Sequence, residues 1–233
     1  MKYFVGLLLG MIVGVAIFGA AIYWNPFVGR SSVSPLALST DMVELTFSEV
    51  PEKSIAWIDN GDSAWPPHPQ KVQELWEPAI ADTVVLVTRL NDSRGQPAGF
   101  GIKFSTGAES ARLMNGEVLV NSVWHVWLSG QGGLLIEQTE NEWPWLRDVV
   151  IPARWSTSNH WRGTWFGILT VGPSALGSGR VTAGSGRFSG AEGEAVEARR
   201  ASAYSATSGP AAVDGSLTVV LSDRSAADEV MPQ

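Results

Sequence analysis

The 233-residue chain contains no cysteine. Neither a disulfide nor a cysteine metal-ligand set can therefore form. If the chain is exported, its stability must come from a sufficiently large hydrophobic core instead of disulfides. The three histidines, His68, His125 and His160, do not occur in the HxH or HExxH spacing of a zinc site. The sequence therefore predicts no metal and no cofactor.

Charge is also scarce, and its balance is acidic. Charged residues make up 17% of the chain, the formal net charge is −7, and the pI is near 5.0. Without a basic patch to displace counterions from phosphates, nucleic-acid binding is excluded as a function class. The sequence also contains no nucleotide-binding motif and no GxSxG motif of a serine hydrolase. The segment Gly184-Ser185-Gly186 is not a phosphate-binding loop, because it lacks the lysine and the following helix that phosphate binding requires.

What the chain does have is one long uncharged run, from Tyr3 to Trp24. As a helix this run spans about 33 Å, enough to cross the hydrocarbon core of a bilayer, so we expect residues 1–24 to be a transmembrane anchor. Gly6, Gly10 and Gly14 recur at every fourth position and form a flat strip on which another transmembrane helix can pack. Glycine is also common in membrane helices in general, so both interpretations of the strip stay open.

The ends of this run bear on its processing and its orientation. A cleaved signal peptide is the competing interpretation, because Lys2 precedes the run and Gly19-Ala20-Ala21 resembles a cleavage site. The length of the run and the closing Tyr23-Trp24 pair, typical of a membrane–water interface, favour an uncleaved anchor. Lys2 before the run and only Arg30 close behind it favour a cytoplasmic N-terminus and, in a bacterium, a periplasmic domain held at the inner membrane.

Residues 41–222 are predicted to form a single β-rich domain. The 25 glycines and 11 tryptophans indicate tight turns and an unusual load of large aromatic side chains. Residues 25–40, rich in proline and serine, are interpreted as a linker, and residues 223–233 as a flexible polar tail.

Alternating apolar residues and glycine-rich turns predict a succession of strands in this domain. The strongest signal is the hairpin of residues 117–128 and 134–140 around Ser129–Gly133. About eight antiparallel strands with short connections indicate an up-and-down β-barrel, with a two-sheet sandwich as the alternative. The expected succession is 83–90, 99–105, 117–128, 134–140, 161–171, 180–183, 191–204 and 216–221, and residues 41–50 are a further possible strand.

Two segments interrupt this pattern. Val72, Leu75, Trp76 and Ile80 lie at helical spacing and predict a short amphipathic helix near residues 70–80. Residues 141–160 are expected to be an irregular tryptophan-rich insertion, because prolines break any regular element there. Long irregular insertions in compact domains are more often functional than idle.

The segment Gly179–Glu194, together with Asp214-Gly215, resembles the glycine-rich hairpin of the allene oxide cyclase and dirigent-type β-barrels. The resemblance covers about a fifth of the chain and rests on one spacing, that of Gly184, Gly186, Phe188, Gly190 and Gly193. It implies an eight-stranded barrel in which an aromatic side chain plugs the interior after a tight glycine turn. It also permits a cavity for a hydrophobic ligand, since members of that group orient or cyclise reactive hydrophobic intermediates, although their catalytic residues do not map onto this sequence.

No catalytic constellation is visible in the sequence. His125 and Glu137 are the candidates for acid–base chemistry if the barrel is an enzyme, with a hydrogen-bonded structural histidine as the alternative for His125. Charged residues cluster around the insertion and could supply an acid or base at the barrel mouth, or form surface ion pairs. They are Glu137, Glu140, Glu142, Arg147, Asp148, Arg154 and Arg162.

Tryptophans are the stronger candidates for a functional surface. Five of them lie in or beside the insertion and suit either docking to a protein or the lining of an apolar pocket. They are Trp143, Trp145, Trp155, Trp161 and Trp165.

Two functions are compatible with these features. The first is a non-enzymatic, single-pass accessory subunit whose helix packs against transmembrane helices of a larger inner-membrane complex, respiratory or photosynthetic for instance, while a periplasmic barrel braces it. The second is a membrane-anchored barrel that binds or cyclises a hydrophobic small molecule, as the resemblance implies. A hollow barrel would favour the second function, and a barrel filled by its own side chains would favour the first.

Overall fold

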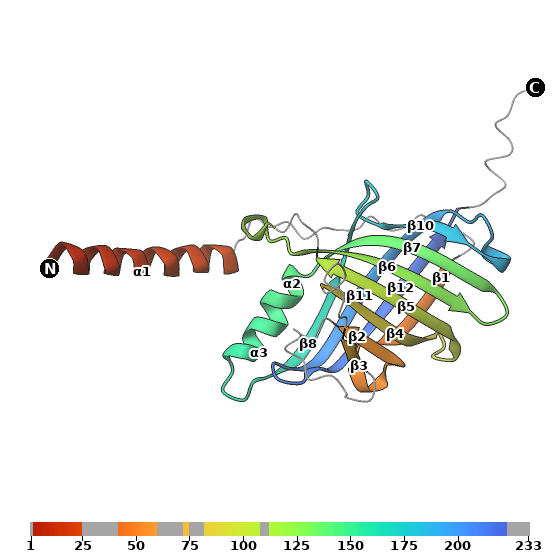
Figure 1. The fold of residues 1–233 in the computed structure, drawn as a ribbon, viewed down its shortest axis with the longest axis horizontal. Coiled ribbons are helices and arrows are strands. Elements are labelled where there is room, and N and C mark those ends of the chain that lie inside the picture. The colour runs from red at the N-terminus through yellow and green to blue at the C-terminus, as the bar shows by residue number, and fades with distance from the viewer. Residues whose placement is uncertain (1, 25–41, 60–71, 75–81, 108–111, 223–233) are drawn as a thin grey trace, which may run out of the picture.

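The computed structural model describes residues 2–24, 42–59, 72–74, 82–107 and 112–222. It contains an N-terminal helix and a closed, eight-stranded antiparallel β-barrel (Figure 1). The barrel predicted from the sequence is confirmed, and the sandwich alternative is wrong. The linker at 25–40 and the tail at 223–233 lie outside the described residues.

The barrel wall follows the order β1-β12-β11-β10-β7-β6-β5-β4, and the ring closes where Thr46 of β1 pairs with Asn91 of β4. Most neighbours in the ring are also consecutive ring strands along the chain. The eight strands are β1 (Met42–Ser48), β4 (Thr83–Asn91), β5 (Pro97–Gly107), β6 (Leu119–Leu128), β7 (Gly132–Asn141), β10 (Gly179–Gly184), β11 (Gly193–Ser205) and β12 (Gly209–Leu221).

Four further described strands lie beside this ring. β8 (His160–Ile168) pairs with the second half of β11, and β9 (Thr170–Gly172) pairs with β7. β2 (Ala56–Asp59) pairs with the edge of β4, and β3 (Val72–Glu74) pairs in parallel with β2.

The prediction of a helix near residues 70–80 is wrong for residues 72–74, which are the described part of this range. Residues 72–74 are extended, because backbone pairing with β2 outweighs a weak helical spacing over so few residues. The other residues of that prediction, apart from 72–74, lie outside the described part.

The insertion is helical rather than irregular. It forms α2 (Trp143–Trp145), a π-helical turn η3 (Leu146–Val150) and α3 (Ile151–Trp155). Pro144 stands in the first turn of α2, where a missing N–H costs no hydrogen bond. Pro152 lies directly after the π-helical turn, and the backbone stays helical through it to Trp155. Neither proline therefore ends the helical insertion.

The glycine-rich segment after β10 forms a tight turn that is followed by a buried aromatic side chain. After β10, the 3₁₀ turn η4 (Gly186–Phe188) brings Phe188 into the core, where it is 2% exposed. Gly186 has a φ of +64° and lies against the Gln131 carbonyl group, so no side chain fits there. The remaining short 3₁₀ turns are η1 (Pro51–Lys53) and η2 (Leu113–Asn115).

The N-terminal helix α1 (Lys2–Tyr23) is long and apolar enough to cross a membrane. Its described side chains from Phe4 to Gly19 are all exposed, so this helix is not the core helix of a soluble domain. Length and composition alone also suit a signal sequence.

Candidate functional site

The barrel interior contains a cluster of buried charged side chains. Lys103 of β5 lies between Glu140 of β7 and Glu197 of β11, with Nζ at 2.9 Å from Glu140 Oε2 and 2.7 Å from Glu197 Oε1. All three side chains point inward, and their exposed fractions are 7%, 1% and 0%. We call these three residues the charge cluster.

Neutral side chains complete the hydrogen bonding of the two carboxylates. The Trp124 indole N–H donates to Glu197 Oε2 at 2.7 Å, and the Gln138 amide donates to both carboxylates. The Ser122 hydroxyl donates to Glu140, and the Thr170 hydroxyl accepts from the Glu197 backbone N–H at 2.7 Å. Buried charges are tolerated when they are paired and hydrogen-bonded in this way.

The two carboxyl groups of the charge cluster differ in acidity. Burial and the negative charge of Glu140 raise the pKa of Glu197 to about 7. Burial also acts to raise the pKa of Glu140, but Lys103 and the Ser122 hydroxyl outweigh it and hold that pKa below its usual value. Burial acts to lower the pKa of Lys103, yet the two carboxylates overcome it and raise that pKa, so the lysine carries its charge.

A second buried ion-pair group lies closer to the helical insertion. Arg199 of β11 contacts Glu49 through Nε at 2.7 Å and Glu142 through Nη1 at 2.7 Å. Its guanidinium group also lies 5.1 Å from the ring centre of Trp145. Arg199 thus connects the charged interior to the aromatic residues of the insertion.

The described inner side chains occupy the barrel in successive layers. One end holds an apolar core that includes Phe47 and Trp124, whose rings meet at 4.8 Å, and it is plugged by Phe188. The charge cluster comes next, followed by Arg199 and then by a second apolar cluster around Trp145. A hollow of about 240 Å³ lies at the Phe188 end, lined in part by Leu45, Leu128, Phe188 and Leu221.

The sequence candidates for acid–base chemistry do not join this cluster. His125 and Glu137 occupy the alternate positions of β6 and β7 and are exposed on the outer wall of the barrel. Glu137 is paired in register with Arg180 of β10. Of the charged residues predicted around the barrel mouth, Glu140 and Glu142 do point inward, whereas Arg147 and Asp148 form a partly exposed pair with each other.

The five candidate tryptophans divide into two groups. Trp143, Trp145 and Trp165 are buried at 7%, 3% and 8% exposure, and Trp161 is half-buried. Only Trp155 is widely exposed. Most of this aromatic density therefore serves packing between the insertion and the barrel.

The sequence patterns did not predict three of the buried charged residues, namely Lys103, Glu197 and Arg199. Each is a charged residue at an inward position of a strand: Lys103 lies between Gly101 and Ser105 on its face of β5, and Glu197 and Arg199 are neighbours on one face of β11. A count of charged residues at inward positions would have found them, although it would not have shown that they meet.

The glycines of the predicted helix-packing strip lie apart from the other residues that the structure describes. A Cβ built at Gly6, Gly10 or Gly14 meets nothing within 4 Å. The same holds for Gly19 on the opposite side of α1. A comparison with family models and with curated proteins finds no match for the chain.

Proposed function

We propose that the protein is a non-enzymatic, single-pass accessory subunit of a larger inner-membrane complex. In this proposal α1 remains attached as an anchor and packs against helices of the complex through Gly6, Gly10 and Gly14. The barrel lies on the periplasmic side and braces the outer surface of the assembly. The complex is of respiratory or photosynthetic type, for instance.

The observation that carries this proposal is the pairing of the charges in the barrel. The described buried ionisable groups, in the charge cluster and around Arg199, face one another across the interior. An active site needs at least one such group turned toward a substrate. A scaffold instead uses them to hold the wall strands together.

Two further observations support retention of the helix. The Tyr23 hydroxyl donates to the Arg147 carbonyl oxygen at 3.3 Å, and the Tyr23 ring stacks on Trp155. The anchor thus ends on the barrel's own helical insertion, as expected of a mature part of the molecule. The charge bias of Lys2 against Arg30 favours the N-terminus inside the cell.

The test is a native gel of membranes extracted in mild detergent. The wild-type chain should migrate in a large complex, and Gly10→Leu should shift it toward the monomer, because a leucine keeps the partner helix at a distance. Gly19→Leu is the matched control, since residue 19 lies two and a half helical turns after residue 10 and faces the opposite side. A monomer in every detergent condition would refute the proposal.

A second candidate is ligand chemistry of the allene oxide cyclase type. It is favoured by Glu197, because a carboxyl group with a pKa of about 7 beside a lysine can exchange a proton near neutral pH inside a barrel. Mass spectrometry of an organic extract of the purified chain tests it. A stoichiometric hydrophobic molecule that is lost in Glu197→Gln would support this candidate, and bulk membrane lipids alone would contradict it.

A further inference from the structure

One end of the barrel lies where α1 ends. β6 begins and β7 ends at this end, because Leu119 is paired with Asn141, and the helical insertion follows directly after β7. Tyr23 connects α1 to the helical insertion, because its ring lies 5.9 Å from the ring of Trp155 at an angle of 28°. Figure 1 shows α3 at the side of the barrel that lies nearest α1.

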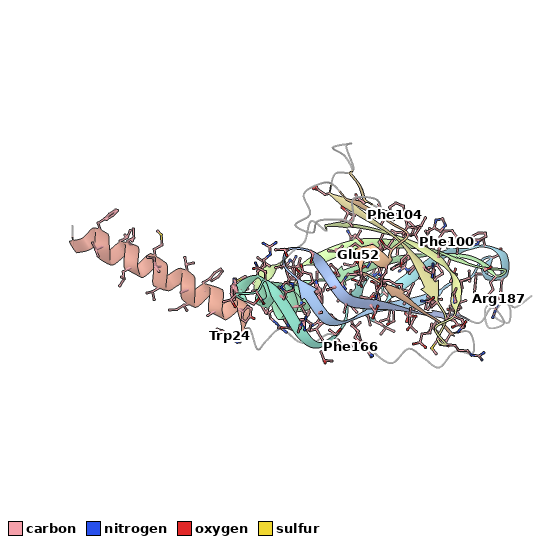
Figure 2. The ribbon with its side chains drawn as sticks, turned by 90° about the horizontal axis from the view of Figure 1, so that it is seen from below. Trp24, Glu52, Phe100, Phe104, Phe166 and Arg187 are labelled. Atoms are coloured by element: carbon pink, nitrogen blue, oxygen red, sulfur yellow. The ribbon has the colours of Figure 1, made fainter. Side chains whose placement is uncertain are left out.

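Exposed apolar side chains gather at this end from three separate parts of the chain. Trp24 follows α1 and is 73% exposed, and Trp155 closes α3 and is 76% exposed. Leu113 and Met114 of η2 are 50% and 62% exposed. Figure 2 shows Trp24 beside the insertion at the barrel end of α1. We call these four residues the end rim.

The η2 turn is held at this end by Asn141. The side-chain amide of Asn141 donates to the Gly116 carbonyl oxygen at 3.0 Å, and its oxygen accepts from the backbone N–H groups of Val118 and Trp143, each at 3.0 Å. One side chain therefore connects η2 to the start of the insertion. The η2 turn, which carries Leu113 and Met114, is therefore held beside the insertion that ends at Trp155.

The charge of the insertion contrasts with that of the whole chain. The helical insertion, residues 143–155, contains Arg147 and Arg154 but only one acidic residue, Asp148, and Arg162 follows in β8, in a protein with a formal net charge of −7. Arg154 and Arg162 are exposed. Arginines flanking exposed tryptophan are typical of surfaces that lie among lipid headgroups, above all anionic ones.

We propose that this end of the barrel is seated in the headgroup layer of the bilayer, with the end rim inserted among phospholipids and Arg154 close to their phosphates. This rests on the proposed function, because it requires α1 to span the membrane. The bilayer is the occupant because α1 leaves it at Tyr23 and Trp24, directly beside Trp155. The barrel is then held against the membrane at a fixed angle, and does not swing freely on its anchor.

The absence of cysteine allows a direct test with single labels on the full chain. Met114→Cys and Trp155→Cys report on the end rim, and Ile12→Cys reports on the middle of α1. Trp127→Cys is the matched control, because Trp127 is 52% exposed but lies toward the opposite end of β6. Each variant carries an environment-sensitive fluorophore and is reconstituted into phosphatidylcholine vesicles with or without phosphatidylglycerol.

We expect labels at 114 and 155 to be quenched by nitroxide lipids labelled near the headgroup and to be several-fold less accessible to iodide than the label at 127. Phosphatidylglycerol should increase this protection, and Arg154→Gln should reduce the increase. If labels at 114 and 155 behave like the label at 127 while the label at 12 is quenched by lipid, the seating is refuted and the anchor stands. If the label at 12 is itself open to iodide, the anchor fails and the seating with it.

Discussion

Glu197 is a buried residue whose protonation changes near neutral pH. Its pKa of about 7 in the folded barrel exceeds the ordinary value of 4.5, because the group is buried and faces Glu140. Between these two values the folded chain holds a proton that the unfolded chain has released. Raising the pH through this window therefore lowers the free energy of unfolding.

Glu197→Gln should remove this dependence. Thermal unfolding across the window should show a melting temperature that falls with pH in the wild type and falls less in the variant. Glu140 does not produce the same effect, because its lowered pKa costs stability only when the pH drops below the ordinary carboxyl range. Glu192→Gln, at an exposed position, is the control. Equal pH profiles for wild type and Glu197→Gln would contradict the assignment.

Lys103 compensates two buried carboxylates at once. Lys103→Met replaces the lysine by an unbranched side chain that is one atom shorter and uncharged, so Glu140 and Glu197 are left facing each other. Breaking a buried pair in this way costs about 3–5 kcal/mol. Urea denaturation followed by tryptophan fluorescence measures the loss, and Lys53→Met, at an exposed site, should stay within about 0.5 kcal/mol of the wild type. Similar midpoints for both variants would show that the charge cluster contributes little to stability.

At the scale of single elements, the helical insertion has an inner and an outer side. Trp145 packs edge-on against Trp165 and Tyr204, with ring centres 5.2 and 5.5 Å apart. Trp155, ten residues later, is exposed to the surroundings. The inner side attaches the insertion to the barrel, and the outer side is free to meet lipid.

Truncation of these two tryptophans should therefore have unequal effects. Trp145→Ala should lower the free energy of unfolding by about 3–5 kcal/mol, as expected for a buried aromatic side chain. Trp155→Ala should change it by less than about 0.5 kcal/mol in detergent solution. Chemical denaturation of both variants measures the difference, and comparable losses would mean that Trp155 has a packing role.

The insertion also shows where sequence reasoning is limited. The prolines at 144 and 152 were interpreted as breakers, because a sequence does not say whether a proline stands in the first turn of a helix or in its middle. The tryptophans were grouped as one surface, because burial depends on the partner strands β8 and β11. The strands of the barrel were easier to predict, since the alternation of inward and outward residues, such as that from Val120 to Leu128, is a local property of the sequence.

At the scale of the whole molecule, the long apolar helix and the barrel follow from patterns within the chain. An uncharged run predicts α1, and repeated alternation with glycine turns predicts the wall. The charge cluster does not follow, because Lys103, Glu140 and Glu197 are far apart in sequence and meet only when the ring closes. The proposed membership of a larger complex depends on groups outside this chain, and the proposal places their contact on the glycine strip of α1.

Site-specific photo-crosslinking in native membranes tests that membership most directly. A photoreactive residue at position 10 should form crosslinks to a transmembrane protein of the complex, and one at position 19, on the opposite side of the helix, should react with lipid. Face-specific crosslinking of this kind is the result that we predict. Equal yields of lipid adducts at both positions, with no protein partner at either, would contradict the central claim.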